Sequence, residues 1–152
     1  MNIRPASPAD REAILALVPR LAECGTPAGR EQRQVVAVDL QTIAAAIDDA
    51  SPESAMLAAE EDGVVVGFVH ARTVTDYYTQ SPIGHVSDLV VAPEAEGKGV
   101  GEALVQAAQA WARCRGYRMM QLYVLPGNAG ARRLYERMGY RAEWFKYVKP
   151  LG

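Results

Sequence analysis

The sequence is poor in cysteine and contains no long apolar run. Two cysteines, Cys24 and Cys114, are too few for a disulfide framework, and the residues around them do not have the spacing of metal ligands. Both lie in helical patterns, so we interpret them as reduced packing residues of a cytoplasmic protein. No stretch of about 18 apolar residues occurs and the first residues are polar, so we expect neither a membrane span nor a signal peptide.

Net charge is also small. The formal net charge is −2, so the chain lacks the basic excess of nucleic-acid-binding proteins, and no nucleic-acid partner is expected. His70 and His85 stand alone in the sequence, without the cluster of partners that a metal site needs. Hydrophobic residues make up 49% of the 152 residues, which is enough for the core of a single domain spanning residues 1–152.

The chain alternates between strand and helix patterns. The predicted strands cover residues 2–6, 55–61, 64–74, 85–91, 117–125 and 140–148. The predicted helices cover residues 8–24, 39–49, 99–116 and 129–138. Pro19 should divide the first helix, residues 25–34 are interpreted as a loop, and Asp62-Gly63 predicts the turn of a hairpin. This order predicts a mixed α/β fold.

The most informative segment joins the 85–91 strand to the 99–116 helix. Gly97, Gly99 and Gly101 carry no Cβ, so the backbone can approach a ligand closely there. The start of a helix adds unpaired N–H groups and the positive end of the helix dipole, and Lys98 adds a charge. The segment is suited to bind a phosphate or pyrophosphate; the alternative is a tight turn that uses glycine for geometry alone.

Two other nucleotide-binding motifs are excluded at this turn. The dinucleotide fingerprint requires a third glycine three residues after Gly101, where the chain has Leu104. The P-loop requires Ser or Thr directly after its lysine, and Lys98 is followed by Gly99.

A second segment of interest is the predicted 129–138 helix. Asn128 is a good cap for its first turn, and Ala131, Leu134 and Met138 form an apolar face. Tyr135 lies one turn after Ala131, and taken alone it is a core aromatic residue with its hydroxyl at the surface.

With both segments in place, the sequence resembles the Gcn5-related N-acetyltransferases over nearly its whole length. The acetyl-CoA signature of that family is Arg or Gln, two residues, Gly, one residue, then Gly or Ala, and it maps onto Glu96, Gly99 and Gly101. A later family motif maps onto Asn128, Ala131, Tyr135, Gly139 and Tyr140. The resemblance implies a single α/β domain whose central mixed, mostly antiparallel twisted sheet splays at the acetyl-CoA site and is flanked by helices.

The resemblance also implies an activity. An amine would attack the thioester of acetyl-CoA directly, with the Val91 N–H as donor to the oxyanion, Leu89 and Val91 holding the pantetheine arm, and Tyr135 as proton donor to the CoA thiolate. The implied cofactor-binding residues are Leu89, Val90, Val91, Glu96, Gly97, Lys98, Gly99, Val100, Gly101, Asn128, Ala131 and Tyr135. The acceptor would be a small-molecule or peptide amine, and Glu23, Glu31, Tyr77 and Tyr78 lie in segments that often line its pocket.

The general base is less clear, because the strand before the signature lacks the glutamate of many relatives. It offers His85 and Asp88, and a chain of waters is the third possibility. Strict alternation would place His85, Leu89 and Val91 on one face and Asp88 on the other.

Glu96 is the main departure from the family pattern. A carboxylate at the first signature position would repel a pyrophosphate, so we expect weaker acetyl-CoA binding unless Glu96 turns outward or pairs with Lys98. Glu96 also keeps a second hypothesis open, a module that binds acetyl-CoA or CoA with little catalysis. Finally, dimers are common in the family, and residues 144–148 could supply a paired or exchanged strand of a homodimer.

Overall fold

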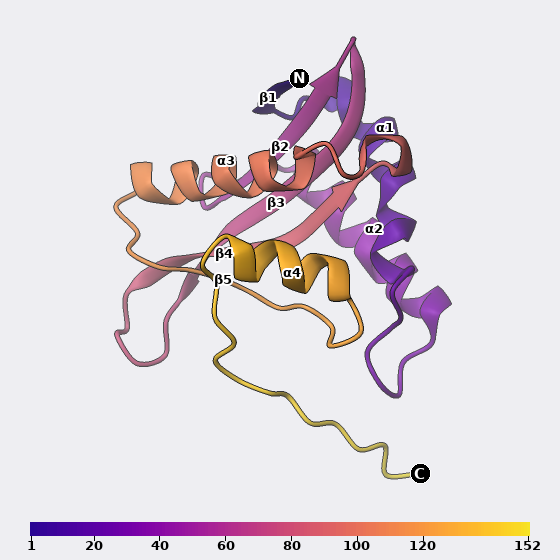
Figure 1. Ribbon diagram of the computed structural model, residues 1–152, viewed down its shortest axis with the longest axis vertical. Coiled ribbons are helices and arrows are strands. Elements are labelled where there is room, and N and C mark those ends of the chain that lie inside the picture. Colours follow the sequence, from indigo (N-terminus) through magenta and orange to yellow (C-terminus); the bar gives the residue numbers. More distant parts are fainter.

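Five strands form one sheet in the order β1-β2-β3-β4-β5, and helices cover both of its faces (Figure 1). The computed structural model describes residues 1–152. The strands are β1 (Asn2–Pro5), β2 (Ser54–Glu61), β3 (Val64–Thr75), β4 (Pro82–Val91) and β5 (Met120–Leu122). The helices are α1 (Arg11–Leu17), α2 (Gln32–Asp48), α3 (Val100–Cys114) and α4 (Ala129–Arg137), with short 3-10 turns η1 (Pro8–Asp10), η2 (Val18–Ala22) and η3 (Pro93–Ala95).

The strand pairing confirms a mixed, mostly antiparallel sheet. Strands β1 to β4 pair antiparallel with their neighbours, and β4 and β5 pair parallel. At the β2–β3 turn, Asp62 and Gly63 have φ values of 51° and 77°, as a two-residue type I′ hairpin turn requires. The β4–β5 pairing covers only Gly84 to Val86, so the two strands separate beyond that point, as expected for a splayed sheet.

Alternation along the strands divides the core into two layers. On one face, Leu104 and Ala108 of α3 pack with Val69 of β3 and Val86 of β4. On the other face, the buried side chains of Ile14, Ile43, Phe68 and Val90 join α1 and α2 to the sheet. The residues of β3 and β4 that face α1 and α2 therefore lie on the opposite side of the sheet from α3.

The predicted helices are found, and one of them begins earlier than expected. The first is divided as expected, because α1 ends at Leu17 and the 3-10 turn η2 contains Pro19. Helix α2 begins at Gln32 rather than at residue 39, so part of the predicted 25–34 loop is helical. Its first turn is polar and exposed, so it forms a helix without contributing to the apolar periodicity from which helices are predicted. No helix combines the length and the hydropathy that crossing a lipid bilayer requires.

The predicted strand at 140–148 is wrong. Residues 140–152 belong to no helix or strand, and Figure 1 shows them as an extended segment that runs away from the sheet. The side chains of Trp144, Phe145 and Tyr147 are 71%, 78% and 92% exposed. The composition is suited to a strand, but a strand forms only where it finds an edge to pair with, and within this chain the segment meets none. Strand β5 covers only Met120–Leu122 of the predicted 117–125, because its pairing with β4 ends at Val86 and Leu122.

Candidate active site

The outer edge of β4 is unpaired where the predicted site begins. Beyond Val86, no strand pairs with β4 on the β5 side. The Ala92 N–H donates to the Val66 carbonyl at 2.7 Å, on the β3 side. Because the N–H and C=O groups of successive strand residues point to opposite sides, those of Leu89 and Val91 point toward the unpaired edge. Leu89 therefore has both main-chain groups, and Val91 its N–H, placed toward an extended ligand such as the pantetheine arm, because the Val91 carbonyl accepts a hydrogen bond from Arg20.

A β-bulge at Ser87 changes which side chains share a face. The register pairs His70 with Asp88 and Ala71 with Val86, so Ser87 is an extra residue in β4. His85 and Asp88 consequently lie on the same face, the one covered by α1 and α2. The alternation expected from the sequence, which put them on opposite faces, is wrong because it assumed an uninterrupted ladder.

This face carries a polar cluster. His70 Nδ1 lies 3.4 Å from Asp88 Oδ2, and Gln121 Nε2 lies 3.0 Å from His85 Nδ1. Both histidines are buried, and burial lowers the pKa of His85 below its ordinary value, so its imidazole is neutral at pH 7. His85 and Asp88 were expected from the sequence, whereas His70 was not, since its approach to Asp88 follows from the β3–β4 register.

Asp39 of α2 adds a second carboxylate to the cluster. Burial raises its pKa first, and the negative charge of Asp88 raises it further. The sequence did not indicate Asp39, because a single aspartate in a helix is usually a solvated side chain. Two carboxylates close enough to interact electrostatically provide a negative environment suited to a protonated amine.

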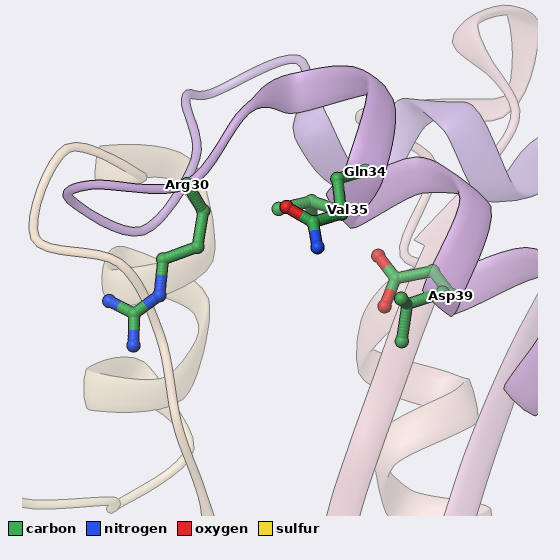
Figure 2. A pocket seen from close by; sticks show the side chains of 5 residues that line it. Arg30, Gln34, Val35 and Asp39 are labelled. Atoms are coloured by element: carbon green, nitrogen blue, oxygen red, sulfur yellow. The ribbon is translucent and has the colours of Figure 1, made fainter.

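Asp39 also lines an open pocket of about 260 Å³ beside the start of α2. The other lining residues are Arg30, Gln34, Val35 and Val38. Figure 2 shows the Arg30 guanidinium and the Asp39 carboxylate on opposite sides, with the Gln34 amide between them. Tyr77 and Tyr78, two of the predicted acceptor residues, do not line this pocket and are 79% and 72% exposed.

The glycine-rich turn leaves a row of backbone donors free. Gly97 and Gly99 have φ values of 73° and 82°, in the left-handed region that favours glycine. The first main-chain bond of α3 runs from the Ala103 N–H to the Gly99 carbonyl at 3.0 Å, so the N–H groups of residues 97–102 have no backbone acceptor. A Cβ placed at Gly97 or Gly99 would meet no atom within 4 Å, so the turn is open. Consecutive free N–H groups at a helix N-terminus suit a pyrophosphate, so the residues present fit that part of acetyl-CoA.

Helix α4 approaches the same turn. A Cβ on Gly101 would lie 3.4 Å from Leu134, so the first turn of α3 lies close to α4. Asn128 caps α4 as expected, its Oδ1 accepting the Ala131 N–H at 3.1 Å, so Ala131 has only its methyl group to offer a ligand. Tyr135 is 8% exposed, and burial raises its pKa to about 12. Its phenol therefore stays protonated and able to donate a hydrogen bond.

Glu96 does not pair with Lys98. Its carboxylate instead accepts a hydrogen bond from Arg20 of η2, which also donates through Nε to the Val91 carbonyl at 2.9 Å. The sequence did not indicate Arg20, because it lies 76 positions from Glu96 and only the packing of η2 against β4 brings them together. The described side chains contain no group of three or more His, Cys, Asp or Glu that could hold a metal ion.

Comparison with known proteins settles the family. The sequence model of the Acetyltransferase (GNAT) family matches residues 20–140. The chain belongs to this family. It is 34% identical over 145 residues to the uncharacterized N-acetyltransferase YhfO of Bacillus subtilis (strain 168), a match that covers 94% of this chain and 91% of that protein.

Two solved structures share the GNAT fold. The ribosomal-protein-alanine N-acetyltransferase of Brucella melitensis biovar Abortus 2308 has a TM-score of 0.74 and 23% identity, covering 99% of this chain and 100% of that one. The aminoglycoside N-acetyltransferase AAC(6')-Iy in complex with CoA has a TM-score of 0.73 and 23% identity, covering 99% of this chain and 95% of that one. At this level of identity the likeness concerns the fold. The free donors of the GNAT signature turn and the unpaired edge of β4 are properties of this chain's own structure.

Proposed function

We propose that this GNAT protein transfers the acetyl group of acetyl-CoA to a cationic amine. The observation that carries the proposal is the pairing of two features: the free N–H groups of residues 97–102 and the unpaired β4 edge at Leu89 and Val91. The first suits the diphosphate of acetyl-CoA, and the second suits its extended amide-bearing arm. The carboxylates of Asp39 and Asp88 on the α2 side support a positively charged acceptor, either a small molecule or a peptide.

In the proposed reaction the neutral amine nitrogen attacks the thioester carbonyl carbon. The carbonyl oxygen gains negative charge and is met by the Val91 N–H, a contribution of about 3–4 kcal/mol for a well-placed donor. The C–S bond then breaks, CoA leaves as its thiolate with the Tyr135 phenol donating a hydrogen bond to the sulfur, and the acylated nitrogen releases its extra proton to solvent. The products are the N-acetylated amine and CoA.

For the proton of the incoming ammonium we propose Asp88 as the acceptor, directly or through a water. When Gln121 Nε2 donates to His85 Nδ1, the neutral imidazole carries its proton on Nε2, so neither ring nitrogen is free to accept another. The carboxylate of Asp88 keeps one oxygen for this task while His70 holds the other. His85 then supports the site without taking the proton.

Replacing Asp88 and replacing Asp39 should change different kinetic parameters. Asp88→Asn should lower kcat by about 10²-fold, the effect typical of a general base. Asp39→Asn should raise the KM for the amine about tenfold at pH 7 with little change in kcat, since one partly exposed charged partner contributes roughly 1–1.5 kcal/mol.

The KM for the amine should also depend on pH. Because the pKa of Asp39 is raised, its side chain becomes charged at a higher pH than an ordinary aspartate. As the pH falls through that pKa, the KM of the native chain for the amine should rise until it equals that of Asp39→Asn.

Asp49→Asn is the matched control for this prediction. Asp49 caps the C-terminal end of the same helix and is exposed, so its replacement should leave both parameters unchanged. Equal effects of Asp39→Asn and Asp49→Asn would show that the Asp39 carboxylate does not contact the acceptor.

The proposed activity is tested by calorimetric titration with acetyl-CoA and an acetyl-transfer screen over small polyamines, aminoglycosides and peptide N-termini. Micromolar binding together with turnover of any amine is the expected result. Tight binding without turnover on the whole panel would favour the alternative, a module that binds acetyl-CoA or CoA and serves as a sensor or partner domain. An absence of binding would contradict both functions.

The homodimer expected from the sequence stays a proposal. The exposed aromatic side chains of Trp144, Phe145 and Tyr147 and the free outer edge of β5 support it, because a strand exchanged between two copies would use both.

A further inference from the structure

Arg20 lies where three parts of the candidate site meet. Its Nε donates to the Val91 carbonyl at 2.9 Å, its Nη1 to Glu23 at 3.1 Å, and its Nη2 to the Glu96 carboxylate. The Arg20 side chain is 19% exposed, compared with 55% for Glu23 and 61% for Glu96. The guanidinium is therefore the enclosed member of the group, held in one orientation by a backbone carbonyl, unlike the mobile partner of an ordinary surface ion pair.

The contact with Val91 places the guanidinium beside the proposed path of acetyl-CoA. The Val91 carbonyl points toward the unpaired edge of β4, and Arg20 reaches it from that side. Glu96, its second partner, directly precedes the free N–H groups of residues 97–102. The guanidinium thus lies between the strand edge that suits the pantetheine arm and the turn that suits the diphosphate.

Charge explains why a cation is needed there. Glu23 and Glu96 together would place two negative charges next to a dianionic diphosphate, and Arg20 offsets one of them. An arginine has five N–H donors, of which three are used in these contacts and two remain for a ligand. A planar guanidinium with free donors on both Nη atoms is well suited to phosphate oxygens.

We propose that Arg20 is an acetyl-CoA-binding residue that neutralises Glu96 and donates to the diphosphate. The signature turn has no positively charged side chain at position 96. Arg20 of η2, which lies outside the signature, supplies that charge. This inference rests on the proposed function, since it requires acetyl-CoA to occupy the turn. It also explains why Glu96 is compatible with the site.

The test compares Arg20→Gln, which removes the charge, with Arg20→Lys, which keeps it. Each is titrated with acetyl-CoA and assayed with acetyl-CoA and with S-acetylpantetheine, which has no diphosphate. Arg20→Gln should raise the Kd for acetyl-CoA at least tenfold, Arg20→Lys should recover part of that loss, and the KM for S-acetylpantetheine should stay within twofold of the native value. Arg11→Gln is the matched control, because Arg11 forms an ion pair with Asp48 on α2 and should not affect binding.

A double variant separates neutralisation from direct binding. If Arg20 donates to the diphosphate, Arg20→Gln combined with Glu96→Gln should still bind acetyl-CoA several-fold more weakly than the native chain. A double variant with the native Kd would overturn the inference, since Arg20 would then serve only to neutralise Glu96. An Arg20→Gln Kd within twofold of the native value, or an equal loss with S-acetylpantetheine, would also overturn it. If the native chain itself does not bind acetyl-CoA, the proposed function is wrong. If the native chain binds and only the results for Arg20→Gln differ from those expected, the Arg20 inference alone is wrong.

Discussion

Replacing Gly99 by valine should weaken acetyl-CoA binding at least 100-fold. Gly99 has a φ of 82°, which a β-branched residue does not adopt without strain, so the backbone of the turn should shift. The N–H groups of residues 97–102 would then no longer converge on one ligand. Loss of two charge-assisted hydrogen bonds costs about 3–6 kcal/mol, and each 1.4 kcal/mol corresponds to roughly tenfold in affinity. Calorimetric titration with acetyl-CoA measures the effect.

Gly116→Val is the matched control for Gly99→Val. Gly116 lies just beyond the C-terminal end of α3 with a φ of 79°, and a Cβ there would also meet open space. Both variants should lose about 1–2 kcal/mol of the free energy of unfolding through left-handed strain, but only Gly99→Val should lose binding. If Gly99→Val binds as tightly as the native chain, the signature turn is not the diphosphate site and the proposed function loses its main support.

The turn could be predicted from the sequence because its geometry is local. Glycines between a strand and a helix define both the left-handed backbone and the helix start, and the Asn128 cap of α4 depends on residues only three positions apart. The hairpin turn at Asp62-Gly63 is local in the same sense. The family motifs fall in these local features, which is why the resemblance was sufficient to predict the fold.

The parts of the site that the sequence did not reveal depend on pairing between distant segments. The bulge at Ser87 is a property of the β3–β4 register, and it alone puts His85 and Asp88 on one face. The Arg20–Glu96 contact joins residues 76 positions apart, so no spacing in the sequence could indicate it. The predicted strand at 140–148 failed for a related reason, since strand propensity does not form a strand without an edge to pair with.

Tyr135→Phe should lower kcat about 100-fold while leaving the Kd for acetyl-CoA within twofold of the native value. The variant keeps the buried ring and loses only the hydroxyl, which in the proposed reaction contacts the departing sulfur. Because burial raises the pKa of Tyr135 to about 12, the phenol stays protonated at every pH used in ordinary assays. Ionisation of Tyr135 should therefore cause no loss of native activity between pH 7 and about pH 10. Single-turnover rates with acetyl-CoA and a productive amine measure the effect on transfer apart from product release.

Tyr140→Phe provides the comparison that makes the result specific. The Tyr140 ring packs edge-on against Tyr135 at a centroid distance of 5.7 Å, and its hydroxyl accepts a hydrogen bond from Gln109 at 2.9 Å. Its replacement removes a hydroxyl of the same kind next to the same ring, but one that is held by Gln109 of α3. Native kcat in Tyr140→Phe together with the loss in Tyr135→Phe would assign the effect to the hydroxyl of Tyr135. Equal and small losses in both variants would mean that Tyr135 only fills the core and does not stabilise the departing CoA thiolate.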